Sequence, residues 1–234
     1  MDFTPSPEQQ AVADVVTSVL ERENTWDALV SGGVVALAVP DRLGGDGLGL
    51  PEAATALTEI GRRGTTGPAL ATIGLALVPL VDLATEAQQD RYLAGVAEGT
   101  VLSAALNEAG NQLPEKPSTS YAGGKLNGTK IGVPYAETAQ WLLVTTDSGV
   151  VVVSPKAAGV TVVKTPTANG SDEYVVTFAD VAVADEDVLA GATVARVNEL
   201  ALAMIGAFGA GLVAGALRLT ADYTATREQF GRPI

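Results

Sequence analysis

The sequence has 234 residues, of which 27 are acidic and 14 basic, giving a formal net charge of −13. This length suits one large domain or two smaller ones, and the charge argues against a nucleic-acid partner, because phosphate binding needs clustered Lys and Arg. Cys and His are absent, which excludes disulfides, thiolate zinc sites, cysteine nucleophiles and Ser–His triads. Acid–base chemistry is left to carboxylates, Lys, Tyr or a cofactor. The polar amino terminus lacks a secretory pattern, so we expect a cytoplasmic location.

Helical signals fill the first hundred residues. Ser6-Pro7-Glu8-Gln9 reads as a capping box, and apolar residues then recur at helical spacing. Thr25 is a candidate cap for a short second helix that ends at Gly32-Gly33. Pro51 can begin a third helix, and Thr85 with Gln88 repeats the capping signature.

The pattern changes to short β-rich runs between Val101 and Leu189. Asn127-Gly128 is a typical hairpin-turn pair, and Asp147-Ser148-Gly149 predicts another tight reversal. No alternation of strands and helices is visible, so we predict an antiparallel barrel or sandwich. The predicted strands are Val101–Leu106, Lys125–Val133, Trp141–Thr146, Val150–Ser154, Val160–Lys164 and Tyr174–Phe178.

A helix is predicted again from Thr193 onward. Leu200–Leu217 holds no charged residue and is long enough to span a bilayer, but it is rich in Ala and Gly and runs on into a charged segment. We therefore favour a buried bundle helix over a membrane span, with Gly211 and Gly215 allowing close helix contact. Gly231 is predicted to cap this helix. So apolar a helix needs partners from another chain or from a further carboxyl-terminal segment.

Arg227 and Phe230 are three residues apart, which on one helix places both side chains on one face. The guanidinium matches phosphate oxygens, and the phenyl ring supplies an apolar surface beside it. Spacing alone favours a plainer reading, in which Arg227 pairs with Asp222 or Glu228 at the surface and Phe230 belongs to the core.

The motifs, taken together, resemble the acyl-CoA dehydrogenase family over nearly the whole chain. The most specific segment is Tyr223–Ile234, which is similar to the family signature Tyr-x-x-x-Arg-x-Gln-Phe-Gly-x-Pro-Ile. Four further segments match family patterns in the same order: Val39–Gly47, Thr85–Gly99, Leu126–Ile131 and Phe178–Leu189.

This resemblance implies an α+β fold with an amino-terminal helical domain (1–100), a central β domain (101–191) and the first helix of an incomplete carboxyl-terminal bundle (192–234). It implies FAD, an acyl-CoA thioester substrate and an electron-transfer acceptor. Arg227, Gln229 and Phe230 are expected to contact the pyrophosphate and adenine end of FAD held by a neighbouring subunit. The family's carboxylate base lies beyond residue 234, so no catalytic residue is assigned, and no metal site is expected.

The sequence departs from the family where a chain contacts its own flavin. Asn107–Pro114 stands in place of Thr-Glu-Pro-x-Ala-Gly-Ser-Asp and lacks the Gly-Ser pair. Gly132 and Pro134 replace a Trp and a hydroxyl residue, and Pro134 has no N–H to donate. The self-supplied half of the flavin site is degraded, whereas the half offered to a partner is intact.

This asymmetry resembles one subunit of the actinobacterial α2β2 acyl-CoA dehydrogenases of steroid side-chain catabolism. The alternatives are a noncatalytic subunit that stabilises a dehydrogenase partner, and a conventional homotetrameric dehydrogenase. Solvated faces and turn caps are the preferred explanation for the other carboxylates considered as bases, which are Glu108, Glu137, Asp172, Glu173 and Glu199.

Overall fold

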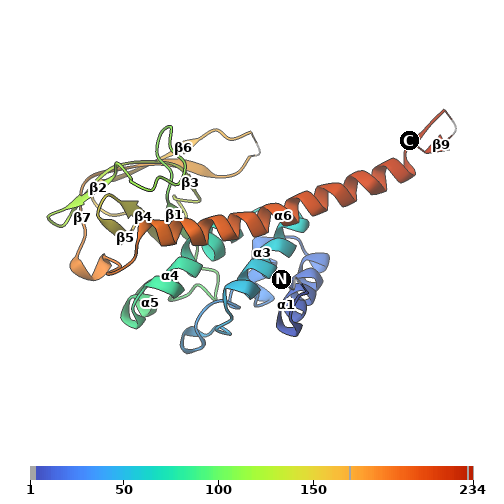
Figure 1. The fold of residues 1–234 in the computed structure, drawn as a ribbon, viewed down its shortest axis with the longest axis horizontal. Helices are drawn as coiled ribbons and strands as arrows, with labels where there is room; N and C mark the ends of the chain where they lie inside the picture. The colour runs from blue at the N-terminus through green and yellow to red at the C-terminus, as the bar shows by residue number, and fades with distance from the viewer. Residues whose placement is uncertain (1–3, 169, 231, 234) are drawn as a thin grey trace.

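The computed structural model describes residues 4–168, 170–230 and 232–233. Helices come first, two β-sheets follow, and one long helix closes the chain (Figure 1). This is the predicted order of an α+β fold; the domain limits at residues 100 and 191 stay a prediction. The helices are α1 (Pro7–Arg22), α2 (Trp26–Ser31), η1 (Asp41–Leu43), α3 (Leu50–Arg62), η2 (Leu70–Leu77), α4 (Val78–Leu83), α5 (Glu86–Tyr92), η3 (Asp185–Asp187) and α6 (Val194–Thr226).

The predicted helix caps are confirmed. The Ser6 hydroxyl accepts the Gln9 N–H at 3.1 Å while the Gln9 side chain accepts the Ser6 N–H at 2.8 Å, and Thr85 with Gln88 repeats the arrangement. No separate element was predicted for η2 and α4. Their residues are mostly apolar, and those of η2 are almost all buried, so no helical periodicity of polar and apolar residues marks them.

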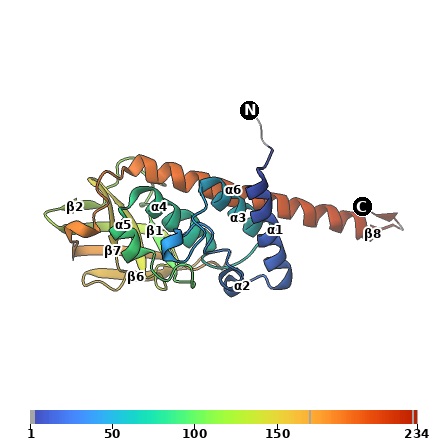
Figure 2. The same cartoon turned by 90° about the horizontal axis from the view of Figure 1, so that it is seen from below.

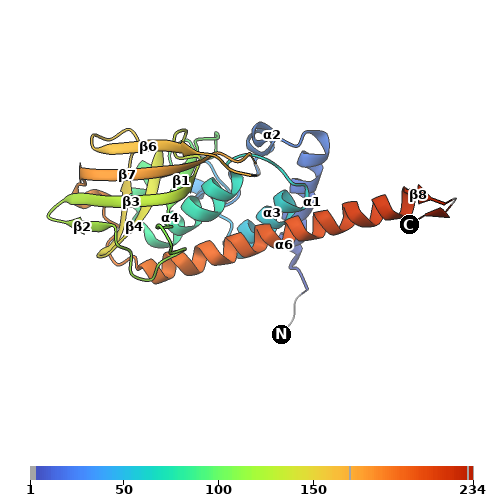
Figure 3. The same ribbon diagram turned by 90° about the horizontal axis from the view of Figure 1, so that it is seen from above.

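The strands form two main sheets. One has the order β1-β4-β5 and the other β2-β3-β7-β6, and the latter lie side by side in Figure 3. All pairs are antiparallel except β1 with β4, which are parallel, so the prediction of a purely antiparallel domain is wrong at this pair. The strands are β1 (Leu102–Ala105), β2 (Ser120–Ala122), β3 (Lys125–Pro134), β4 (Trp141–Thr146), β5 (Gly149–Val153), β6 (Val160–Thr165) and β7 (Glu173–Ala182).

The three-stranded sheet is buried on both faces. Leu143 and Val152 belong to the core shared with the helices, whereas Leu142 and Val153 belong to the core between the two sheets. Because successive side chains point to opposite faces, this double burial explains the continuous apolar runs of β4 and β5. The sheet thereby joins the helical and β regions.

The predicted turn at Asn127-Gly128 is wrong, because both residues lie inside β3. The reversal between β2 and β3 occurs at Gly123 and Gly124, which both have left-handed backbone angles. The register shifts between Leu126 and Gly128, and a Cβ on Gly128 would lie 2.7 Å from the Thr119 Cα. Gly128 therefore serves close backbone packing rather than a turn.

Helix α6 extends over 33 residues and passes successively along α4 and α3 (Figure 2). Of the helices in the described ranges, it is the one whose length and apolar composition would let it cross a membrane. Only 22% of its most apolar stretch is buried within this chain. Leu202, Val213 and Leu217 are exposed, so the prediction of a bundle helix completed by partners from outside this chain stays a prediction.

Glycines allow α3 and α6 to pack backbone against backbone. A Cβ on Gly211 would lie 1.9 Å from the Thr58 carbonyl oxygen, and one on Gly215 would lie 2.2 Å from that of Arg62. Gly61 makes the reciprocal approach to the Phe208 carbonyl, at 2.2 Å. The predicted role of Gly211 and Gly215 in close helix contact is confirmed.

A buried carboxylate organises the loop between β1 and β2. Glu108 accepts hydrogen bonds from the backbone and hydroxyl of Ser118 and of Thr119, and forms an ion pair with Lys130 at 2.9 Å. Burial acts to raise the pKa of Glu108, but the hydrogen bonds from Ser118, Lys130 and Thr119 hold that pKa well below its usual range. The expectation that Glu108 lies on a solvated face is therefore wrong.

The glycine contact leads to a first prediction. Gly211→Ala should lower the free energy of unfolding by roughly 1–3 kcal/mol, because the new methyl group would meet the backbone of α3. Gly209→Ala is the matched control, since nothing lies within 4 Å of its added Cβ, and it should raise stability by about 0.5–1 kcal/mol. Urea unfolding followed by circular dichroism measures both values; equal effects would contradict the packing described.

The buried ion pair leads to a second prediction. Glu108→Gln should lower the free energy of unfolding by roughly 3–5 kcal/mol, because it leaves the Lys130 ammonium buried without a counter-charge. Since the pKa of Glu108 is lowered by folding, its contribution is present above about pH 4.3 and declines as the pH falls further. Acid titration should therefore destabilise the natural chain more steeply than the variant.

The exposed pair of Arg196 with Glu199, at 3.5 Å, provides the control. Glu199→Gln should cost less than about 1 kcal/mol. A Glu108→Gln variant no less stable than this control would show that the buried pair is not what holds the loop.

Candidate functional site

The three predicted cofactor-binding residues lie at the far end of α6. The helix ends at Thr226, and Arg227 is its C-cap, with an extended backbone and an N–H donated to the Tyr223 carbonyl at 2.8 Å. A small hairpin follows, in which β8 (Glu228–Gln229) pairs with β9 (Arg232–Pro233). Phe230 occupies the turn with a left-handed backbone, φ 55°.

Two sequence-based expectations fail at this hairpin. Arg227 and Phe230 do not share a helical face, because the helix has already ended. The predicted cap residue, Gly231, lies outside the described residues, but the helix stops five residues before it. A turn built on Phe230 was not visible in the periodicity, which continues smoothly into the charged segment.

The hairpin side chains face outward. Arg227, Gln229 and Phe230 are all exposed, and Phe230 completely so, at 101% of its reference surface. The plainer reading of a core phenylalanine is therefore wrong. The hairpin projects well away from the body of the chain (Figure 1). These side chains are therefore open to contacts beyond the described residues.

Arg227 has not formed the surface ion pair that spacing favoured. Asp222 accepts instead from Arg218, at 3.2 Å. Within the described part of the chain no carboxylate lies within 4 Å of the Arg227 guanidinium, which lies over the Tyr223 ring at 5.9 Å. The N–H groups of an arginine held in this way remain available to an external anion.

The two segments that depart from the family pattern meet in one cavity. A hollow of about 300 Å³ is lined by Asn107, Gln112 and Leu113 from the loop after β1, and by Gly132 and Pro134 from β3. The far wall is formed by η2 and α6, through Leu75, Leu202 and Ile205. Sequence reasoning therefore identified residues that the fold does bring together.

Several polar groups around this cavity are engaged within the chain. The Asn107 side chain accepts the Leu113 N–H at 3.0 Å, and its carbonyl accepts the Ile131 N–H at 3.0 Å. The Pro134 carbonyl accepts from the Ser103 hydroxyl, and Pro134 has no N–H of its own. Pro134 therefore offers no donor to a pyrophosphate, whereas a guanidinium such as that of Arg227 does.

Asn198 fastens the same loop to α6 and was missed by the sequence analysis. Its amide nitrogen donates to the carbonyls of Leu113 at 3.0 Å and Pro114 at 3.3 Å. Its Oδ1 atom is buried and has no hydrogen-bond partner among the described residues. The one signal in the sequence is a lone amide at the start of a long apolar helix.

A second cavity, of about 390 Å³, adjoins the first and shares Leu75 and Pro134 with it. Its other walls include the loop at Gly64–Gly67 and the α6 residues Phe208 and Leu212. Tyr135 lines it with a left-handed backbone, φ 51°, and burial, with the nearby Asp172 charge, raises the pKa of its phenol. These mainly apolar walls can accommodate a hydrophobic group. No pattern in the sequence indicated a role for Tyr135.

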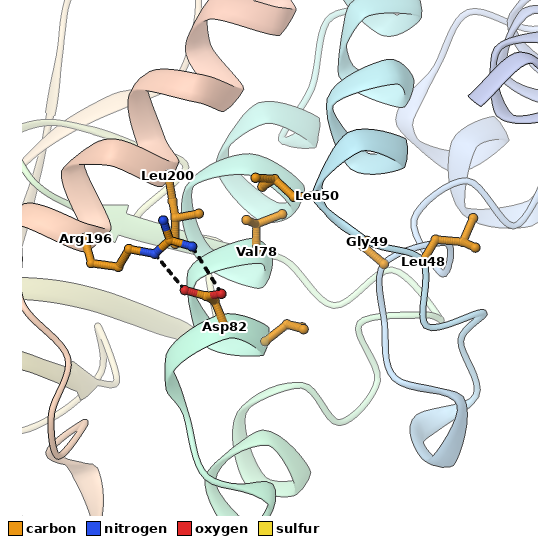
Figure 4. A pocket seen from close by; sticks show the side chains of 9 residues that line it. Leu48, Gly49, Leu50, Val78, Asp82, Arg196 and Leu200 are labelled. Carbon is orange, nitrogen blue, oxygen red and sulfur yellow. Dashed lines mark hydrogen bonds and ion pairs between the residues drawn. The ribbon is translucent and has the colours of Figure 1, made fainter. Parts of the chain in front are cut away.

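A third cavity, of about 320 Å³, lies between the start of α3, α4 and the first turns of α6 (Figure 4). Leu50, Val78 and Leu200 form its apolar wall. Arg196 and Asp82 face each other across one end, joined by two contacts of 2.9 and 3.3 Å. Because the guanidinium is neutralised by Asp82, it is not a free anion-binding group.

The remaining carboxylates considered as bases have ordinary partners. Glu137 accepts from the Tyr174 hydroxyl at 3.0 Å, and Asp172 pairs with Lys164 near the protein surface. Glu173 accepts from the Ser171 hydroxyl at 3.3 Å, and Glu199 pairs with Arg196. None of these contacts assigns a catalytic base.

Comparisons with known proteins agree with this architecture. The family model described as "Acyl-CoA dehydrogenase, N-terminal domain" matches residues 6–100. The chain is 66% identical over 234 residues to the acyl-CoA dehydrogenase FadE28 of Mycobacterium tuberculosis. The alignment covers all of this chain and 69% of that protein.

Solved structures show the same fold. The ChsE4–ChsE5 complex of Mycobacterium tuberculosis superimposes with a TM-score of 0.87 at 26% identity, covering 100% of this chain and 71% of the matched one. A variant of the Tcur3481–Tcur3483 steroid ACAD gives 0.86 at 28% identity, with 97% and 69% covered. With FadE28 two-thirds identical and matched along the whole of the present sequence, the chain belongs to the acyl-CoA dehydrogenase family.

Proposed function

We propose that this chain is a subunit of a heteromeric, FAD-dependent acyl-CoA dehydrogenase and lends Arg227, Gln229 and Phe230 to flavin held mainly by its partner. The observation that carries this proposal is the projecting hairpin, whose arginine has no carboxylate partner among the described residues. A chain with a net charge of −13 has acidic groups in excess. An exposed arginine that is nevertheless unneutralised is suited to an external anion.

Each hairpin side chain has a chemical part in this proposal. The Arg227 guanidinium provides a planar set of donors that matches two phosphate oxygens, and its charge offsets theirs. The exposed Phe230 ring offers an apolar surface for a planar base. Gln229 adds an amide that can donate and accept. Bound FAD would supply the hydride acceptor for α,β-dehydrogenation of an acyl-CoA thioester.

The asymmetry of the chain supports a heteromer over a homotetramer. At the cavity, Gly132 has no side chain and Pro134 has no N–H, so a second copy of this chain would offer the flavin few donors there. A related but different dehydrogenase subunit would supply the missing donors. Solved relatives named as complexes of two different proteins, ChsE4–ChsE5 and Tcur3481–Tcur3483, support this arrangement.

The acyl group is proposed to be a steroid side chain carried as its CoA thioester. Support comes from the steroid ACAD among the similar structures and from the apolar cavity beside Tyr135, Phe208 and Leu212. The exposed face of α6 is proposed to be covered by further helices rather than lipid, and reduced flavin is proposed to pass its electrons to an electron-transfer protein. No residue between 1 and 234 is assigned as the catalytic base.

Flavin absorbance tests the proposal. We expect the purified chain to be colourless, and the assembly recovered with it from its native cells to be yellow and to contain a second acyl-CoA dehydrogenase chain. Arg227→Ala should weaken FAD binding by about tenfold or more, because it removes charge-assisted hydrogen bonds. FAD content after gel filtration is the measurement.

Arg42→Ala is the control, because it removes an exposed arginine that is already paired with Asp90 and lies away from the hairpin. It should leave FAD content unchanged. Full flavin retention by the Arg227→Ala assembly would favour a purely structural subunit. A yellow chain in isolation would favour a homomeric dehydrogenase and sink the proposal.

A further inference from the structure

Tyr223 holds the guanidinium of Arg227 at the end of α6. The Arg227 Cζ atom lies over the Tyr223 ring, 5.9 Å from its centre. The backbone reinforces this contact, because the Arg227 N–H donates to the Tyr223 carbonyl at 2.8 Å. The two residues are one helical turn apart, at the point where the helix gives way to the hairpin. Tyr223 itself is 52% exposed, so it is not a core residue.

Arg227 is held by a ring without a carboxylate. Arg91 also lies over two rings, but it forms ion pairs as well. Ion pairs hold the Arg42, Arg62, Arg63, Arg91, Arg196 and Arg218 guanidinium groups. A carboxylate would bind the N–H groups of Arg227 and cancel its charge. An aromatic face attracts the cation without doing either. The tyrosine therefore restricts the side chain while leaving its donors free.

Restricting Arg227 in advance has a thermodynamic consequence. A free arginine side chain populates many rotamers, and ordering it upon ligand binding costs conformational entropy. An arginine that already lies against a ring pays less of that cost when it meets a phosphate group. Asp222 does not compete with the ring for Arg227, since Arg218 holds it at 3.2 Å.

We infer that Tyr223 is a positioning residue, which pre-orders Arg227 for a pyrophosphate held by another subunit. This inference rests on the proposed function of the hairpin and adds to it a residue that does not itself contact the nucleotide. Tyr223 acts through its ring rather than its hydroxyl. The inference therefore predicts different effects on FAD binding for loss of the ring, for loss of the hydroxyl alone, and for loss of the ring when Arg227 is absent.

The test measures the FAD dissociation constant of the complete assembly after removal and rebinding of the flavin. Tyr223→Leu should raise this constant about two- to fivefold, the size expected for an exposed cation–π contact. Tyr223→Phe keeps the ring and should leave the constant unchanged. In an Arg227→Ala background, Tyr223→Leu should cause no further loss, because its effect passes through the guanidinium.

Each other outcome has a defined meaning. A loss caused equally by Tyr223→Phe and Tyr223→Leu would assign the effect to the hydroxyl and overturn the inference. An equal loss from Tyr223→Leu with and without Arg227 would show a contact independent of the arginine, and would overturn it too. An unchanged constant in Arg227→Ala alone would instead refute the proposed function. Arg42→Gln removes an exposed arginine that is paired with Asp90 and lies away from the hairpin; it is expected to be silent and controls for lost charge.

Discussion

The close contact between α3 and α6 determines where the functional end of the chain lies. Three glycines let the two backbones approach to distances that no side chain would permit, which fixes α6 against the body along its middle. The terminal hairpin is carried at the far end of that helix, beyond the α3 contact (Figure 1). A rigid arm of this kind can place an arginine at a defined point outside its own subunit. The proposed sharing of flavin depends on this geometry.

Two surfaces of the chain have opposite character toward a dinucleotide. At the cavity after β1, Asn107, Asn198 and Ser103 form hydrogen bonds within the chain, and Pro134 has no N–H to donate. At the hairpin, an arginine and an aromatic ring remain open to an external ligand. Under the proposed function, this chain would give contacts to a partner's flavin rather than hold its own. A heteromer is the arrangement in which both properties are useful.

Local signals in the sequence predicted much of the fold. The capping boxes at Ser6 and Thr85 mark helix starts because their hydrogen bonds involve neighbours only, and Gly211 with Gly215 correctly indicated close packing. Prediction failed where distant contacts decide. The parallel pairing of β1 with β4 and the burial of Glu108 beside Lys130 have no local signature. The prediction at the hairpin failed for a different reason, because Phe230 adopts a left-handed turn within a segment whose periodicity continues as a helix.

The loop after β1 is anchored in part by a residue that does not line its cavity. Glu108 binds Ser118, Thr119 and Lys130, while Asn107, Gln112 and Leu113 line the hollow. Residues of this loop that face the cavity, such as Gln112, can therefore change without loss of the Glu108 contacts. After a gene duplication, this separation would let one copy lose its own cofactor site, keep its fold, and persist as a subunit of a complex with the other copy's product.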